Sequence, residues 1–310
     1  MTIRFTKPAI GLRGIPVSNG LPQGPADLIV FGAPHGTPYR DIDNGPFGVA
    51  PAAIRQGVSH YAEWMDHWDF DVGGPILGEG PFHPFDAGDL PTTPLDGAGN
   101  RALIRDATAA VLAKGAVPVM IGGDDSTPIP FIEGFAKHGP ICIVQIDAHI
   151  DWREEREGEL YGFSSTMRRA SEMAHVTHMV QVGMRGFGSA RAREVEDATR
   201  WGAKLVTARE VHNRGIGAAL QHVPAGARCV ITVDCDGLDP SIMPAVMALA
   251  PGGLTYTQAI DLIAGVAAKA RIAGFDLVEF VPERDSGGLA AMTAGRLAVN
   301  ALGHVARQKR

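Results

Sequence analysis

The sequence has few cysteines, no long apolar run and no excess of positive charge. Its three cysteines, Cys142, Cys229 and Cys235, lie in or beside expected core strands, and they lack the even count and the spacing of a disulfide framework. We therefore expect buried free thiols in a reducing compartment. Residues 1–8 contain no apolar signal core, and no uninterrupted apolar segment approaches the roughly 20 residues that span a bilayer. These absences predict a soluble, cytoplasmic protein.

Composition and length narrow the class of protein further. The net charge of −6 argues against a general nucleic-acid surface. The 310 residues are long enough for one large α/β domain or two small ones, and 45% of them are hydrophobic. Because we find no linker, repeat or low-complexity tract, we expect residues 1–310 to form a single α/β domain.

Strand-like and helix-like runs alternate along the chain. The expected strands are 27–33, 84–88, 117–121, 140–146, 178–183, 203–207, 228–233 and 273–279. The expected helices are 51–64, 98–114, 127–137, 166–174, 189–201, 255–270 and 287–306. Because the strands are continuously apolar, this alternation predicts a parallel sheet that is covered by helices on both faces.

Three metal-capable side chains follow one of these strands within five residues. Asp147, His149 and Asp151 come directly after the apolar run 141–146. Residues two apart in extended backbone point to the same face, so all three can converge at the carboxyl end of the strand. A single aspartate there often caps the next helix, but three ligands on one face are hard to explain by capping.

A second strand end repeats the pattern. The β-branched run 230–233 is followed by Asp234 and Asp236, which again share a face. Ligands of open α/β sheets bind outside the carboxyl ends of strands, which supports one shared site. The alternative is a purely structural acidic cluster, but four grouped carboxylates would repel one another strongly without cations. Two divalent ions would neutralise them, and oxygen-rich ligands with one nitrogen suit Mn²⁺, with Fe²⁺, Co²⁺ or Ni²⁺ as alternatives.

At this point the chain resembles a known family, the ureohydrolases (arginases, agmatinases and related guanidino-group hydrolases). The resemblance runs from about residue 27 to 305. It rests on the two acidic motifs, 147–151 and 234–240, and on the shorter motifs 32–34, 45–46, 86–89, 122–126, 252–254 and 274–279. It implies a three-layer α/β/α sandwich with a mostly parallel eight-stranded sheet, and trimers or hexamers of one chain. A heteromer is an alternative.

The resemblance also implies a binuclear metal site. Its two divalent ions would be Mn²⁺, with Ni²⁺ in some related enzymes. Asp147 and Asp234 match the bridging carboxylates, Asp151 matches a ligand of one ion, and His149 and Asp236 match ligands of the other. Glu279 matches the residue that receives the guanidinium group of a small-molecule substrate.

The implied reaction is an agmatinase-like hydrolysis of a guanidino C–N bond, which yields urea or a substituted urea and an amine. Two cations about 3.5–4 Å apart can share a water and supply hydroxide at neutral pH. Asp151 would accept a hydrogen bond from that hydroxide and orient it. Glu279 would pair with the planar guanidinium, which gives orientation as well as charge.

The sequence departs from the family pattern at two histidine positions. Asp125 stands where the family carries a histidine ligand, which gives five carboxylates around two dications and favours a hard cation. Ser164 replaces a loop histidine, and serine cannot shuttle a proton near pH 7. His35, in a loop that lines the family's active site, is a candidate for that task. His35 and Ser164 are also candidates for substrate binding. A polar loop histidine with neither task is the alternative.

The third departure is the loop 241–251, which keeps the family length but is more apolar. An apolar wall would suit a substrate with an alkyl or otherwise uncharged tail, and it argues against arginine. Alternatively, this loop packs against a neighbouring subunit.

Two other functions stay open at this stage. One is a weakly active or non-catalytic subunit of a heteromeric ureohydrolase, which the changes at Asp125 and Ser164 suggest. The other is an amide hydrolase of the related deacetylase-type fold with a single metal, which the second acidic motif disfavours.

Overall fold

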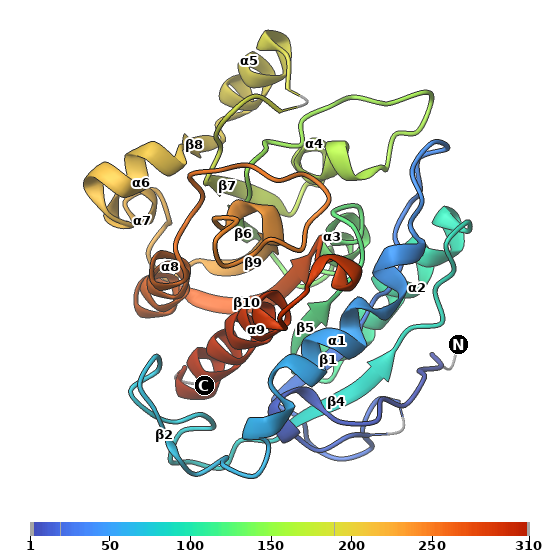
Figure 1. Ribbon diagram of the computed structural model, residues 1–310, viewed down its shortest axis with the longest axis vertical. Helices are drawn as coiled ribbons and strands as arrows, with labels where there is room; N and C mark the ends of the chain where they lie inside the picture. Colours follow the sequence, from blue (N-terminus) through green and yellow to red (C-terminus); the bar gives the residue numbers. More distant parts are fainter. Residues whose placement is uncertain (1–2, 19, 189, 309–310) are drawn as a thin grey trace.

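The centre of the computed structural model, which describes residues 3–18, 20–188 and 190–308, is an eight-stranded sheet (Figure 1). Its strands, in chain order, are β1 (Leu28–Gly32), β4 (Pro84–Asp89), β5 (Val117–Ile121), β6 (Ile141–Ile146), β7 (Val176–Val182), β8 (Lys204–Val206), β9 (Arg228–Asp234) and β10 (Arg271–Val278). Their spatial order is β4-β1-β5-β10-β9-β6-β7-β8, and all neighbours pair in parallel. The expected parallel sheet is confirmed.

Side chains alternate between two cores along each strand. In β5, Val119 and Ile121 belong to one hydrophobic cluster and Met120 belongs to the other. In β6, Val144 and Ile143 divide in the same way. Because successive strand residues point to opposite faces, continuously apolar strands require a covering layer on each face.

Helices supply those two layers. The first cluster receives side chains from α1 (Ala50–Gly57), α6 (Ala208–Arg214), α7 (Gly217–Leu220), α8 (Tyr256–Lys269) and α9 (Leu289–Arg307). The second receives them from α2 (Gly97–Ala113), α3 (Pro128–Glu133), α4 (Thr166–Ser171) and α5 (Ala192–Trp201). The expected three-layer α/β/α sandwich is therefore confirmed. The expectation of free, buried cysteines is confirmed as well, since all three thiols are unpaired and buried.

The expected helices differ from the structure mainly at their ends and in the short elements. The helix expected over 51–64 ends at Gly57, where an added Cβ would lie 2.5 Å from the backbone of Ala291 in α9. The helix expected over 189–201 starts at Ala192 in α5, and residue 189 itself lies outside the described residues. The structure adds α6, α7 and a small hairpin of β2 (Trp68–Asp69) and β3 (Gly74–Pro75). Among the described residues, no helix combines the length and the apolarity that a bilayer crossing requires.

Four neighbouring strands end at one edge of the sheet and position the acidic motifs. They are β5, β10, β9 and β6, which are consecutive in the sheet. After β5 the chain turns through Gly122 and Gly123, whose φ angles of 90° and 83° favour glycine. The carbonyl oxygen of Gly123 accepts a hydrogen bond from the backbone N–H of Glu279, at 2.9 Å, so the ends of β5 and β10 are tied together.

Candidate metal centre

Two groups of metal-capable side chains meet beyond these strand ends. Asp147, His149 and Asp236 form one group, and Asp125, Asp147 and Asp151 form the other. Within each group the ligand atoms lie within 4.8 Å of one another. Because Asp147 belongs to both, the structure brings together five predicted ligands in an arrangement that offers two adjacent metal positions. This arrangement also disfavours the single-metal alternative.

Asp234, the sixth predicted ligand, lines the same cavity but belongs to neither group. Its Oδ1 accepts a hydrogen bond from the backbone N–H of Asp236 at 2.7 Å, which closes the turn after β9. Gly237 lies against the end of β6, since an added Cβ would come within 2.6 Å of the backbone nitrogen of Asp147. The second acidic motif is thereby held next to the first.

Burial and mutual repulsion act together on these carboxyl groups. Burial, followed by the charges of Asp151 and Asp147, raises the pKa of Asp125 well above its usual range. Burial and neighbouring carboxylates raise the pKa of Asp147 and of Asp234 in the same way. Without cations the cluster therefore retains protons, and a dication at each group would replace those protons and balance the charge.

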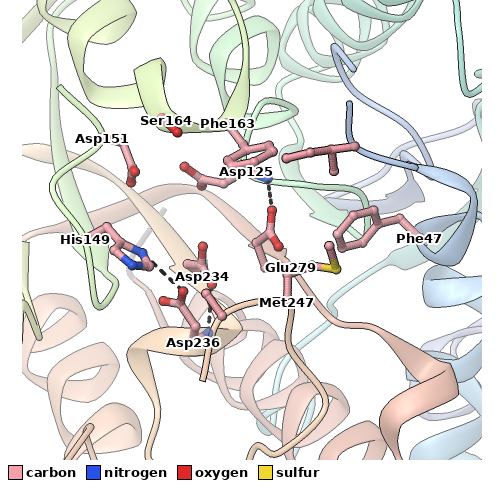
Figure 2. A pocket seen from close by; sticks show the side chains of 12 residues that line it. Phe47, Asp125, His149, Asp151, Phe163, Ser164, Asp234, Asp236, Met247 and Glu279 are labelled. Carbon is pink, nitrogen blue, oxygen red and sulfur yellow. Dashed lines mark hydrogen bonds and ion pairs between the residues drawn. The ribbon is translucent and has the colours of Figure 1, made fainter. Parts of the chain in front are cut away.

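The neighbouring carboxylates also shift the pKa of His149. Its Nδ1 lies 3.2 Å from Oδ2 of Asp236 (Figure 2). The same nitrogen lies 3.4 Å from Oδ1 of Asp147. Although burial lowers its pKa, the hydrogen bond and the charge of Asp236 raise it to about 10. A metal would take the place of that proton, because a histidine ligand must be neutral.

Asp125 gives the most direct indication that the site fits a cation. Both of its carboxylate oxygens are buried and have no hydrogen-bond partner, although the residue is only 3% exposed. Two orphaned acceptors in one buried side chain are costly unless a cation or a proton meets them. The donor set, which consists of carboxylates and one imidazole, fits hard or borderline divalent ions.

Glu279 faces the same cavity from the end of β10 (Figure 2). Its Oε1 accepts a hydrogen bond from the backbone N–H of Asp125 at 2.9 Å. Glu279 and Asp151 have φ angles of 64° and 46°, a region that non-glycine residues rarely adopt. Backbone strain of this kind clusters at functional sites, where surrounding contacts hold a side chain in place.

A buried chain of polar side chains supports the carboxylates, and it was missed in the sequence. Nε2 of Gln145 donates to Oδ2 of Asp147 at 2.5 Å and to Oδ2 of Asp151 at 3.1 Å. Oε1 of Gln145 accepts from Nε2 of Gln181 at 2.5 Å, and Oε1 of Gln181 accepts from the indole N–H of Trp152 at 2.8 Å. A glutamine inside an otherwise apolar strand was the signal that could have revealed this chain.

The structure separates the two predicted loop residues. Ser164 lines the cavity, and its backbone N–H donates to the hydroxyl of Tyr39 at 3.3 Å. His35 is not among the described residues that line the cavity, and its Nδ1 lies 3.3 Å from the hydroxyl oxygen of Thr92. A substrate role for His35 stays a prediction without support from this geometry.

Fold and site together define an α/β protein with a carboxylate-rich cluster, at the edge of a parallel sheet, that could hold metal ions at two adjacent positions. Residues 26–303 match the model of the arginase family. The chain belongs to the arginase family, and it is an arginase-family hydrolase.

Individual relatives agree with this assignment. Proclavaminate amidinohydrolase from Streptomyces clavuligerus is 31% identical over 313 residues, which cover 96% of this chain and 95% of that protein. N(1)-aminopropylagmatine ureohydrolase from Thermus thermophilus is 33% identical over 202 residues, covering 65% of this chain and 67% of that protein. The solved structure of the Streptomyces enzyme superposes with a TM-score of 0.77 and 26% identity, covering 100% and 98% of the two chains.

Proposed function

We propose that the protein is a binuclear metal-dependent hydrolase that cleaves the C–N bond of a guanidino compound. The observation that carries this proposal is the pair of ligand groups that share Asp147, with Glu279 facing the same cavity. The names of similar proteins support it, since they include an amidinohydrolase, a ureohydrolase and a guanidinobutyrase from Pseudomonas aeruginosa. The agmatinase-like type is the nearest named class.

We assign the metal ligands as in the sequence analysis, with Asp147 shared, and we propose Mn²⁺ as the resident ion. Ni²⁺ is the alternative. When bound, two such ions lower the pKa of a shared water, so that hydroxide is available at neutral pH. A carboxylate-rich set of five acidic ligands and one histidine suits Mn²⁺ better than softer ions.

The chain's own residues bind and orient the reactants. Glu279 receives the guanidinium through the carboxylate oxygen that the N–H of Asp125 leaves free. Asp151 accepts a hydrogen bond from the attacking water and orients it, and the amide of Gln145 holds the Asp151 carboxylate in place. Hydrolysis adds the oxygen to the guanidinium carbon and a proton to the departing nitrogen, giving urea or a substituted urea and an amine.

Urea release from the Mn²⁺-loaded protein tests this function. The substrates should include agmatine, 4-guanidinobutyrate, arginine and uncharged alkylguanidines. We expect turnover of at least one of them, and Glu279→Gln should lower kcat/KM by about 10²–10³-fold with unchanged metal content. Absence of urea from every compound, in protein that holds two metals, would contradict the proposal.

A weakly active subunit of a heteromer is the second candidate, and Ser164 favours it. A serine in the cavity wall cannot return a proton to the leaving nitrogen near pH 7. Asp125 speaks against this candidate, because it still offers a ligand in one of the two groups. Activity that appears only after a ureohydrolase partner chain is added would support it.

We also propose a cytoplasmic location and a homo-oligomer, as a trimer or a hexamer. Sedimentation of the purified chain tests the assembly. A single species with the mass of three or six chains of 32.7 kDa is expected.

A further inference from the structure

The walls of the cavity differ sharply from its floor. The floor carries the carboxylates and His149, whereas the walls consist of Ile42, Phe47, Phe163, Met247 and Ala248. Figure 2 shows the two aromatic rings and the methionine around the entrance to Glu279. The cavity holds about 210 Å³, which is smaller than sites for drug-sized ligands. A guanidinium on Glu279 would therefore leave room for a short tail that touches these walls.

The aromatic walls are held in place by their surroundings. Phe47 is 1% exposed. Phe163 packs edge-on against Tyr39 with 4.7 Å between ring centroids, and Tyr39 is itself 3% exposed. Rings fixed in this way present a preformed apolar surface rather than one that could turn aside for a charged group.

The described residues of the cavity walls include no cationic side chain that could pair with an acidic tail. Among the described residues that line the cavity, none is lysine or arginine. Arg156, which stacks over Tyr39 at 4.7 Å, is already paired with Asp41. A substrate carboxylate would thus be buried against apolar walls without a cationic side chain as partner, which is costly.

The described wall residues also offer few hydrogen-bond acceptors for an ammonium tail. The five wall side chains offer no strong hydrogen-bond acceptor, since the thioether of Met247 accepts only weakly. Among the described lining residues, Ser164 carries the one polar side chain outside the floor. An ammonium with three donors would lose most of its hydration without replacement.

We propose that the substrate is a guanidine whose tail is short, uncharged and apolar, an N-alkyl or N-arylalkyl guanidine. This inference rests on the proposed function. Hydrolysis would yield urea and an apolar amine. The aminopropylagmatine ureohydrolase and the guanidinobutyrase bear names of substrates with charged tails, so this chain differs from those relatives in what its walls accept.

The test compares three guanidines of similar length with the Mn²⁺-loaded protein. The tail of agmatine ends in an ammonium group, and the tail of 4-guanidinobutyrate ends in a carboxylate. Pentylguanidine, the third compound, has a methyl group in place of the ammonium of agmatine. We expect kcat/KM for pentylguanidine to exceed both others by at least about tenfold. Equal or faster turnover of agmatine or 4-guanidinobutyrate overturns the apolar tail and leaves the hydrolase standing. Urea from arginine alone likewise overturns only the apolar tail, and absence of urea from all three and from arginine overturns both proposals.

A matched pair of variants tests the wall itself. Met247→Lys should shift the ratio of kcat/KM toward 4-guanidinobutyrate by about tenfold, because it adds a cation to the wall. Leu249→Lys is the control, since Leu249 is 58% exposed in the same loop and does not line the cavity. An unchanged ratio in Met247→Lys, or an equal shift in both variants, contradicts the inference. An equal change of oligomeric mass in both variants would show that a neighbouring subunit covers this loop instead, and would overturn the inference too.

Discussion

At the residue scale, the most informative side chain is that of Asp125. It is buried, and neither of its carboxylate oxygens has a hydrogen-bond partner. The sequence marked this residue only as a departure from a family histidine. The structure places its carboxylate within 4.8 Å of those of Asp147 and Asp151, so the departure from histidine changes the type of the candidate ligand and does not remove it. An imidazole in its place would add a second nitrogen and remove one negative charge.

We therefore expect Asp125→His to move metal preference toward Ni²⁺ or Co²⁺ relative to Mn²⁺. The physical reason is that imidazole suits later transition metals, whereas carboxylate suits Mn²⁺. Calorimetric titration of each ion measures the preference. Asp125→Asn is the control, and it should weaken binding of all ions. Unchanged stoichiometry and affinities in Asp125→His would show that residue 125 is not a ligand.

Gln145 provides the second prediction at this scale. Its amide donates to Asp147 and Asp151 and is itself oriented by Gln181. Loss of a hydrogen bond to a metal-binding side chain typically lowers metal affinity by 10–100-fold. We expect Gln145→Met, which keeps the side-chain size, to weaken Mn²⁺ binding by about that factor in a calorimetric titration.

Thr232→Val is the matched control for Gln145→Met. Thr232 lies opposite Gln145 in the register of β6 and β9, is fully buried, and donates to Asp276 at 2.7 Å instead of to a metal ligand. The Thr232→Val variant should be less stable than wild type and should bind Mn²⁺ with unchanged affinity. Equal Mn²⁺ affinities in wild type and both variants would show that Gln145 only packs.

At the scale of elements, two buried polar features connect neighbouring elements, and the first of them links α1 to β4. Nε of Arg55 lies 2.8 Å from Oδ2 of Asp86, and its Nη1 lies 2.7 Å from Oδ1 of Asp89. Arg55 and Asp86 are 1% and 0% exposed. Removal of one partner of such a pair leaves a buried uncompensated charge.

We expect Arg55→Met to lower the free energy of unfolding by about 3–5 kcal/mol. Arg105→Met is the control, because the pair of Arg105 and Asp106 is solvent-exposed and should contribute about 1 kcal/mol or less. Urea denaturation measures both. A loss in Arg55→Met no larger than in the control would mean that α1 is held by packing alone.

The second buried feature is Asp276 of β10. Burial raises the pKa of Asp276 to about 8, although the hydroxyl of Thr232 donates to it. The folded chain therefore keeps the proton at pH values where the unfolded chain, with an ordinary pKa near 3.8, has lost it. This contribution to stability is fully present below about pH 4 and is lost as the pH rises through about 8.

Asp276→Asn should remove this pH dependence. We expect the free energy of unfolding of the variant, relative to wild type, to increase steadily from pH 4 to pH 8 and then to level off. Denaturation in the presence of a chelator, at several pH values, measures the difference and keeps metal binding out of it. A constant difference across this range would mean that Asp276 titrates normally.

Some secondary-structure elements could be predicted from the sequence, and others could not. Long apolar strands and long periodic helices such as α2 and α9 are evident in the sequence, because burial on one face imposes their pattern. The short α6 was missed, although Thr207 and Glu210 form a capping box at its start. The hairpin β2–β3 has two residues in each strand, too few for any periodicity. The helix expected over 51–64 ends at Gly57, and the close approach of Gly57 to α9 is visible only in the fold.

At the scale of the whole molecule, parallel topology places distant motifs at one edge of the sheet. The family pattern let the sequence predict all six ligand candidates and Glu279. It could not predict which side chains support or surround them. The Gln145 chain depends on register between β6 and β7, and the aromatic walls come from loops whose positions follow from the packed sheet. Those features depend on tertiary packing, which local patterns do not encode.

Electron paramagnetic resonance of the protein titrated with Mn²⁺ tests the central claim most directly. Two Mn²⁺ ions held about 3.5–4 Å apart and sharing Asp147 should couple magnetically. We predict an exchange-coupled spectrum that is complete at two ions per chain and absent from Asp147→Asn. Isolated Mn²⁺ signals, or saturation at one ion per chain, would contradict a binuclear centre.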